Sequence, residues 1–433
     1  MVETLLEAAA RQADAAEVYL EESESRPIDF EYNELKYVHT KSRRAVSLRV
    51  IHEGRIGFAS STDLSQPQHL VETAVESARF GQEARFAFPG SARPADVAVH
   101  DARIVEFPVQ EGIALGREAI DRVRAEFDDV LCSVEVAKWV GRTRLANTHG
   151  LDLEAELTGF DAYLVGLRVR DGSILWVSDG ESSRALVTDF DRYTRKVIAD
   201  IRAAQTERKV PSGTLPVLFT ARGMALLLQL VQTIVNGKLV QKGASPLAGR
   251  LGEQVFDPRV SLYDDGTLDY GDGSSPHDGD GTPSCRTPLF ERGVLSNYLF
   301  DLQTAGLMGT ETTANSARPF ASLPRPDASN LVLEAGDQPF DDLLAGLDRG
   351  LLVDEVIGGG QSNVLAGEFS VNVGLGFLVE KGQRVGRVKD CMIAGNLFEV
   401  FHRIRGIGQE QEVHGPIVAP AVCFDAVHVA GAG

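Results

Sequence analysis

Residues 130–177 read VLCSVEVAKWVGRTRLANTHGLDLEAELTGFDAYLVGLRVRDGSILWV. Apolar and polar residues alternate along much of this stretch, which is the period-two pattern of half-buried strands. The alternation predicts a meander of four strands, at Val130–Ala137, Val140–Asn147, Leu153–Arg168 and Ile174–Val177. Because helical patterns flank this meander on both sides, the chain is predicted to have an α+β fold.

The segments before and after the meander mix helical and strand patterns. Apolar residues recur every three to four positions in four segments, which predicts helices at residues 3–13, 65–82, 110–128 and 186–208. Strands are predicted at Ala16–Glu22, Phe30–Tyr37 and Ala45–Ile51, with a hairpin turn at Glu53–Gly57. These elements form a predicted N-terminal α/β domain, residues 1–208, with a mixed or antiparallel sheet. The Pro-, Gly- and Ala-rich stretch Phe88–Ala98 divides this domain into subregions 1–90 and 100–208.

A second predicted domain, residues 209–433, begins at Lys209–Leu215, a segment that contains a proline and a glycine. A short strand at Pro216–Phe219 and a long apolar helix at Met224–Asn236 follow. Many short strands separated by Gly and Asp turns come after the helix. This pattern predicts a curved antiparallel sheet or partial barrel with one long helix.

Composition excludes several classes of function. The 433 residues carry a net charge of −19, which disfavours direct contact with nucleic acid or anionic lipid. Four cysteines without a CxxC argue against a disulfide framework and a ribbon-type zinc site. The N-terminus has early acids and no apolar segment, and no run of 18 apolar residues occurs. We therefore expect a cytoplasmic protein that makes no membrane contact.

The spacing of the histidines does not predict a zinc site on a helix. The nine histidines are nowhere closer than twelve residues, whereas a zinc pair on one helix needs two about one turn apart. His52-Glu53 resembles the start of a zincin motif, but Ile56 and Gly57 stand where the second ligand would be. No metal ligand is therefore predicted in this chain.

Two clusters remain as alternative sites. The acidic run from Asp264 to Asp280 begins like a calcium loop, but no Glu closes it, so solvated turns are the favoured interpretation. Cys391 lies near His402 in the sequence, and such pairs can be nucleophilic, although the apolar neighbours of Cys391 favour a buried core thiol. Neither cluster predicts a reaction by itself.

An ordered set of short motifs along nearly the whole chain resembles the TldD/PmbA family, once called modulators of DNA gyrase. The N-terminal stretches are Ala16–Tyr19, Arg55–Leu64 and Leu145–Leu151. The match is densest in the C-terminal half, at Lys242–Ser245, Gly249–Phe256, Asp264–Thr267, Asp280–Pro283, Gly293–Leu295, Asn315–Arg318 and Ile404–Gly408. No single stretch is specific for the family, but the order and spacing of the whole set are.

The resemblance implies a heteromeric zinc protease whose TldD-type subunit carries HExxxH on a helix shortly before the segment that matches Lys242–Ser245. Leu228, Gln229 and Thr233 stand at the positions of the first His, the Glu and the second His. None of these side chains can serve as the ligand or the base that the motif supplies. The chain therefore resembles the PmbA/TldE branch, which lacks the metal site, and zinc is expected in a TldD-type partner.

On this resemblance the chain is expected to be a non-catalytic subunit that helps to enclose a chamber and to bind small or unfolded peptides. Asn315 and Arg318 are the candidate groove or interface residues, and an equally weighted alternative makes them a structural loop clamp. Other hypotheses stay open: a stand-alone peptide- or protein-binding homodimer without protease activity, a gyrase regulator, or an enzyme that uses another site.

Overall fold

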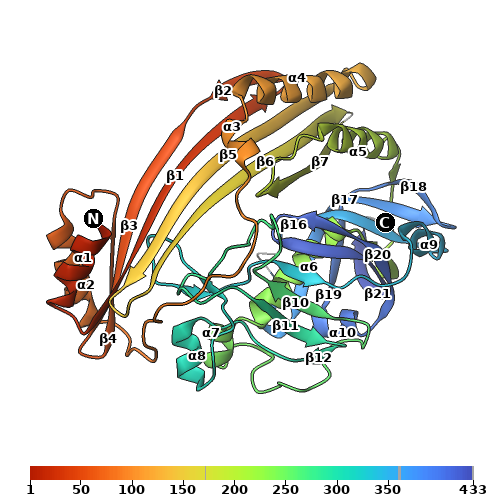
Figure 1. Cartoon of the computed structure of the whole chain (residues 1–433). Helices are drawn as coiled ribbons and strands as arrows, with labels where there is room; N and C mark the ends of the chain where they lie inside the picture. Colours follow the sequence, from red (N-terminus) through yellow and green to blue (C-terminus); the bar gives the residue numbers. More distant parts are fainter. Residues whose placement is uncertain (171, 359–361, 432–433) are drawn as a thin grey trace.

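The computed structural model describes residues 1–170, 172–358 and 362–431 (Figure 1). Its N-terminal half is built on a seven-stranded sheet in which every pairing is antiparallel. The strands run in the order β4-β3-β1-β5-β6-β7, and β2 pairs with β1. They are β1 (Ala15–Glu31), β2 (Glu34–Val38), β3 (Lys41–His52), β4 (Arg55–Ser61), β5 (Val130–Asn147), β6 (Asp152–Arg170) and β7 (Ser173–Ser183).

Helices cover this sheet at its two ends, whereas loops of the C-terminal half pack against part of the sheet between them (Figure 1). At one end, α1 (Val2–Ala10) and α2 (Pro67–Ala78) bury a small apolar core with β1, β3 and β4. At the other end, α3 (Ala102–Glu106), α4 (Val109–Glu126) and α5 (Phe190–Ala203) bury a larger core. Helix α5 is shorter than the helix predicted at 186–208. Residues 207–208 are not helical, because they pair with β18 as β8.

Two predicted strand breaks are absent from the structure. The predicted strand at Ala16–Glu22 continues through a polar stretch to the end of β1, because β3 and β5 pair with it on either side. Arg43–Glu21 and Arg44–Glu22 ion pairs cross between strands in this uncovered part, where polar side chains meet water. The strands predicted at 130–137 and 140–147 are likewise one strand, β5.

The C-terminal half holds a twelve-stranded sheet. The strands are β8 (Glu207–Arg208), β9 (Gly213–Phe219), β10 (Leu262–Asp265), β11 (Arg286–Glu291), β12 (Val294–Leu295), β15 (Leu331–Leu333), β16 (Arg349–Gly358), β17 (Glu368–Glu380), β18 (Gln383–Val388), β19 (Cys391–Asn396), β20 (Ile404–His414) and β21 (Ile417–Gly431). Strands β21, β9, β16, β17 and β19 pair in a ring and close a five-stranded barrel. The predicted α+β fold with a curled sheet is confirmed, and the barrel is closed.

Short elements complete the C-terminal half. They are α7 (Gly237–Gln241), α8 (Leu302–Met308), α9 (Phe340–Ala345), α10 (Leu397–Phe401), the 3-10 turn η1 (Val364–Ala366), and the ribbon of β13 (Ser316–Ala317) with β14 (Arg325–Pro326). The long helix α6 (Ala221–Ile234) follows β9 and is capped by Thr220, whose hydroxyl accepts a hydrogen bond from the Gly223 amide. The helix lies in the main apolar core with the barrel strands.

The two halves share apolar surface. Leu352 and Phe377 of the barrel belong to the same buried cluster as Tyr193 and Ile201 of α5. Within the described ranges, no helix has the length and apolar character needed to cross a membrane.

Candidate functional site

Helix α6 carries Leu228, Gln229 and Thr233, the residues that the resemblance places at the positions of the zinc motif. Leu228 is fully buried in the apolar core, whereas Gln229, one position later, is exposed. The Thr233 hydroxyl donates a hydrogen bond to the Gln229 carbonyl at 2.9 Å, one helical turn away. These residues do not fit a zinc ion, because Leu228 has no lone pair and faces the core.

Metal-binding groups are not gathered elsewhere in the part of the chain that the structure describes. There, no set of three or more His, Cys, Asp and Glu side chains lies in an arrangement that could hold a metal ion.

A crevice of about 740 Å³ lies between the two halves of the chain. One wall is residues 179–183 of β7 with Arg192 and Lys196 of α5, and the other is residues 411–414 of β20. The loop 268–272 closes one end. A neighbouring cavity of about 390 Å³ shares Lys196 and Glu412 with this crevice. The residues between the halves therefore surround a space large enough for a peptide segment.

Both strands that line the crevice are edge strands: β7 ends the N-terminal sheet, and β20 pairs with β21 alone among the named strands. The carbonyl groups of Ile174 and Ser178 accept hydrogen bonds from arginine side chains of the C-terminal half, so these residues face away from β6. Because backbone groups alternate in direction along a strand, the N–H and C=O groups of Gly180 and Ser182 also face away from β6, toward the crevice. An edge of this kind can pair with an extended chain.

Neighbouring groups and burial shift the pKa values of the charged side chains in the crevice. His414 Nε2 lies 3.3 Å from Glu412, and this hydrogen bond lowers the pKa of the Glu412 carboxyl. Burial raises the pKa of Asp179. Burial alone would lower the pKa of Lys196, but the carboxylates of Asp354 and Asp200 outweigh it and raise this pKa. Lys196 therefore stays a cation that ties α5 to the barrel.

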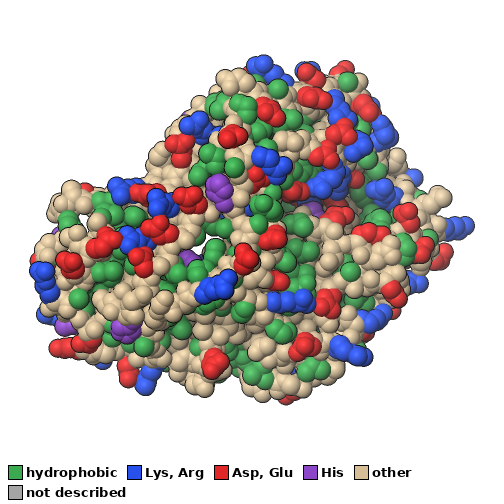
Figure 2. Space-filling model, in the orientation of Figure 1, with side chains coloured by type: hydrophobic (Ala, Val, Ile, Leu, Met, Phe, Trp, Pro, Cys, Tyr) green, Lys and Arg blue, Asp and Glu red, His purple; other side chains and the backbone are tan. Residues whose placement is uncertain are grey.

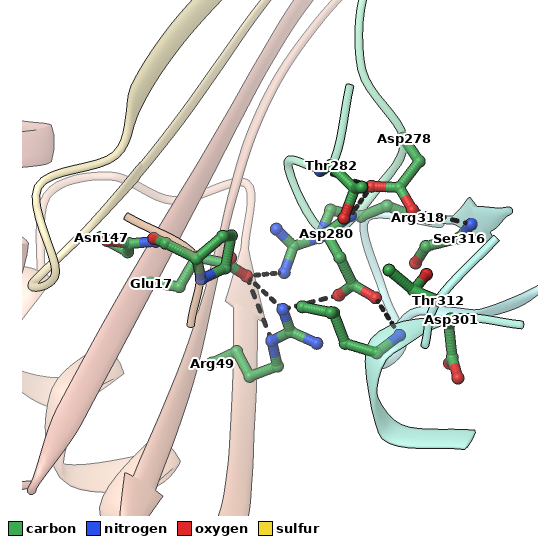
Figure 3. A network of polar contacts seen from close by, with 12 residues as sticks. Glu17, Arg49, Asn147, Asp278, Asp280, Thr282, Asp301, Thr312, Ser316 and Arg318 are labelled. Carbon is green, nitrogen blue, oxygen red and sulfur yellow. Dashed lines mark hydrogen bonds and ion pairs between the residues drawn. The ribbon is translucent and has the colours of Figure 1, made fainter. Parts of the chain in front are cut away.

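A buried ion quartet joins the two halves at another place (Figure 3). Arg49 Nη2 lies 2.8 Å from Glu17 Oε1 and 2.7 Å from Asp280 Oδ1, and Arg318 pairs with the same Glu17 oxygen. The four side chains are at most 4% exposed. Burial would raise the pKa of Asp280, but the guanidinium groups of Arg49 and Arg318 outweigh it and lower this pKa. Two cations and two anions therefore balance in a site without bulk water.

Asn315, the other candidate groove residue, is also buried. Its Nδ2 donates to Asp264 Oδ2 at 2.5 Å, and the Ser329 amide donates to Asp264 Oδ1 at 2.7 Å. Burial raises the pKa of Asp264 to about 7. Asn315 and Arg318 together line a cavity of about 210 Å³ between the N-terminal sheet and the loops of the C-terminal half. Both residues thus have partners inside the chain and face a common space.

The prediction of solvated turns is wrong for Asp264, Asp278 and Asp280, which are all buried. Asp264 lies in β10, and the loop that carries Asp278 and Asp280 packs against the N-terminal sheet, where Arg49 and Arg318 supply counter-charges to Asp280. Sequence reasoning missed Arg49 because a charged residue in an alternating strand normally faces water.

Cys391 and His402 show no catalytic arrangement. Cys391 is buried in β19, its sulfur faces the Met392 carbonyl at 4.0 Å, and its strand pairs there with Gly431. Burial raises the pKa of the Cys391 thiol to about 11, which is opposite to what an activated nucleophile needs. His402 caps the C-terminal end of α10, and its amide bonds to the Glu399 carbonyl.

Charge on the molecular surface is mixed. On the face in Figure 2, blue basic and red acidic side chains are interspersed, and the basic ones form no continuous patch there.

Comparison with known proteins agrees with this architecture. The C-terminal domain of the PmbA/TldA metallopeptidases matches residues 212–431, and domain 1 of the same family matches residues 16–78. An uncharacterised protein of Methanocaldococcus jannaschii is 28% identical over an alignment of 442 positions, which covers 98% of this chain and 98% of the relative.

Two crystal structures superpose over 99% of both chains. The putative modulator of a DNA gyrase from Thermotoga maritima has a TM-score of 0.90 and 25% identity. TldE from Thermococcus kodakarensis has a TM-score of 0.90 and 23% identity, a likeness that concerns the fold alone. The match to the C-terminal domain covers just over half of the chain, and the chain therefore belongs to the TldD/PmbA metallopeptidase family.

Proposed function

We propose that this chain is the non-catalytic, PmbA/TldE-type subunit of a heteromeric zinc peptidase and that it holds peptide substrate in the crevice between its two halves. The observation that carries the proposal is the burial of Leu228 in α6. Leu228 packs into the core where a ligand would have to face outward, so zinc and its chemistry are assigned to a TldD-type partner.

The crevice supports the peptide role. Two edge strands line it, and main-chain pairing with an edge accepts extended peptides of many sequences. Acidic side chains outnumber basic ones along the walls, so we expect peptides with basic residues or a free amino group to bind more tightly than acidic ones. The acids are Asp179, Glu181, Asp269, Asp272 and Glu412.

The test combines the purified chain with a TldD-type homologue that carries HExxxH. Each chain alone and the mixture would be examined by size exclusion, zinc analysis and cleavage of an unstructured peptide. We expect the chain alone to be free of zinc and inactive, and cleavage to need both chains. One zinc bound by this chain alone would overturn the proposal, as would a stable homodimer that ignores the TldD-type chain.

A variant tests the crevice itself. Val413 is 46% exposed and lines the crevice, so Val413→Trp should narrow it without disturbing a core. Cleavage should fall at least tenfold while co-elution with the partner persists. Val38→Trp, at a valine of similar exposure on β2, is the matched control and should leave cleavage unchanged. Equal cleavage by both variants would show that peptide does not use the crevice.

A further inference from the structure

The cavity of about 390 Å³ that adjoins the crevice, the side pocket, has an apolar inner wall. The apolar residues that line it are Ala199, Ala221, Phe340, Leu352, Phe377 and Ala421. Leu352, Phe377 and Ala421 belong to the core that joins the two halves, and Phe340 packs against this core. Ala199 is exposed and Phe340 is half-buried, so part of the apolar wall is open to a ligand.

The charged residues of the side pocket are already paired with one another. Lys196 Nζ lies 2.7 Å from Asp200 Oδ2 and 3.1 Å from Asp354 Oδ2. The guanidinium carbon of Arg384 lies 5.5 Å from the centroid of the Phe377 ring, and Arg384 Nη1 lies 3.8 Å from Asp200 Oδ1. Among the described residues, no polar side chain of this lining has a buried nitrogen or oxygen without a partner. A polar group that entered would find no unmet partner, whereas an apolar group would displace water from apolar surface.

The side pocket adjoins the crevice along β20. Glu412 and Lys196 line both spaces, and Glu410 lines the side pocket. Glu410 and Glu412 are exposed, so they lie at its opening and not at its inner wall. A peptide extended along the β20 edge turns successive side chains to opposite faces. One of these side chains can therefore enter the side pocket while the peptide backbone stays in the crevice.

We propose that the side pocket receives one large apolar side chain, aromatic or leucine-like, of the peptide held in the crevice. This inference rests on the proposed peptide role of the crevice and adds the substrate class, which is peptides that carry such a residue. Ala199 and Phe340 are the residues that set the selection, because they are the apolar lining residues most open to a ligand.

Size and ring chemistry fit this occupant. The volume of about 390 Å³ lies within the range of about 300–1,000 Å³ that is usual for ligand pockets. The Phe340 ring, at the start of α9, can make edge or offset contacts with an aromatic side chain. The acidic walls of the crevice favour a basic group elsewhere in the same peptide, so the two spaces select different residues.

The test titrates the full chain, without a partner, with fluorescent Gly/Ser peptides that carry one central Phe, Leu, Asn or Ala. We expect the Phe and Leu peptides to bind about tenfold tighter than the Asn and Ala peptides. Equal affinities of all four would overturn this inference and leave the peptide role of the crevice intact. A second probe, acetyl-Phe-N-methylamide, is too short to span the crevice. Its binding should survive Val413→Trp, which narrows the crevice, so failure of the crevice and failure of the side pocket are distinguishable.

Ala199→Leu fills the side pocket from an exposed position of α5, so the core stays intact. It should weaken binding of the Phe peptide and of acetyl-Phe-N-methylamide about tenfold and leave the affinity of the Ala peptide unchanged. Ala125→Leu is the matched control, because Ala125 is an exposed alanine of α4 that lines neither space, and all affinities should persist. An unchanged ratio of Phe to Ala affinity in Ala199→Leu, or no binding of acetyl-Phe-N-methylamide, would overturn the inference.

Discussion

Glu17 on β1 and Arg318, which lie 301 positions apart in the sequence, form an ion pair in which both side chains are almost completely removed from water. Arg49 and Asp280 complete the group, so each half of the chain contributes one cation and one anion, and each of these two residues pairs with an oppositely charged residue of the other half. The position of the N-terminal sheet over the C-terminal loops therefore depends on the match of these charges.

Removal of one cation from the quartet should be costly. Arg49→Met keeps a similar volume but leaves the Asp280 carboxylate without its closest cation, and we expect a loss of about 3–5 kcal/mol in the free energy of unfolding. Urea unfolding followed by tryptophan fluorescence measures this loss. Arg43→Met, which breaks the more exposed pair with Glu21, is the control and should cost about 0–1 kcal/mol. Similar losses in both variants would mean that the quartet contributes no more than a surface pair.

The pH dependence of stability should report on Asp264. Its pKa of about 7 in the folded chain exceeds the value of about 3.9 in the unfolded chain, so the folded state retains a proton that the unfolded state has released. Stability from this group is therefore present below about pH 4 and is lost as pH rises to about 7.

Asp264→Asn should remove this slope. The difference in unfolding free energy between wild type and variant should change by up to about 1.4 kcal/mol per pH unit between pH 4 and 7. Measurement at several pH values isolates the group, because all other carboxyl groups are common to both proteins. A difference that stays constant across this range would contradict the raised pKa.

Thiol reactivity should distinguish one cysteine from the other three. Cys285 is exposed, whereas burial raises the pKa of Cys132 and Cys423 to about 12 and that of Cys391 to about 11. A thiol reagent should therefore label one site quickly in the native chain and all four after denaturation. Cys285→Ser should abolish the fast phase, and a fast phase that survives would point to Cys391 as an activated thiol.

Helix α6 gives a fourth prediction. Leu228→Ala should lower the unfolding free energy by about 2–5 kcal/mol, because Leu228 is fully buried among barrel residues. Gln229→Ala, one residue later on the exposed face, should change it by no more than about 0.5 kcal/mol. If Leu228→Ala were equally mild, the packing of Leu228 in the apolar core would be contradicted.

The local elements were largely predictable because they depend on periodicity. The long helix expected at Met224–Asn236 lies at Ala221–Ile234, and the strands of the meander lie where alternation placed them. The break expected near residue 138 does not occur, because Trp139 stays paired with β1 and β6 and its indole lies over Gly159, where a Cβ would overlap it. Pairing with neighbours on both sides keeps β5 extended through residues 138 and 139.

The residues of the crevice and the small cavity were mostly not predictable. Asn315 and Arg318 were selected by resemblance, but Glu17 and Arg49 look like ordinary exposed residues of alternating strands. His277 and Ser316 belong to no motif that specifies chemistry. Glu17 and Arg49 are opposite each other in the pairing of β1 with β3, so their opposite charges could have indicated an ion pair. That inference needs the register of the two strands, which the sequence does not give.

By itself, the sequence indicated most of the strands and helices and the resemblance to the family, because these properties depend on residue type and short-range spacing. Through that resemblance it also predicts that Leu228, Gln229 and Thr233 stand at the positions of the zinc motif. Tertiary structure alone decided that Glu17, Arg49, Asp280 and Arg318 meet and that two edge strands face one crevice. These contacts join residues hundreds of positions apart. They depend on strand register and on how the two halves pack, and no local pattern encodes either.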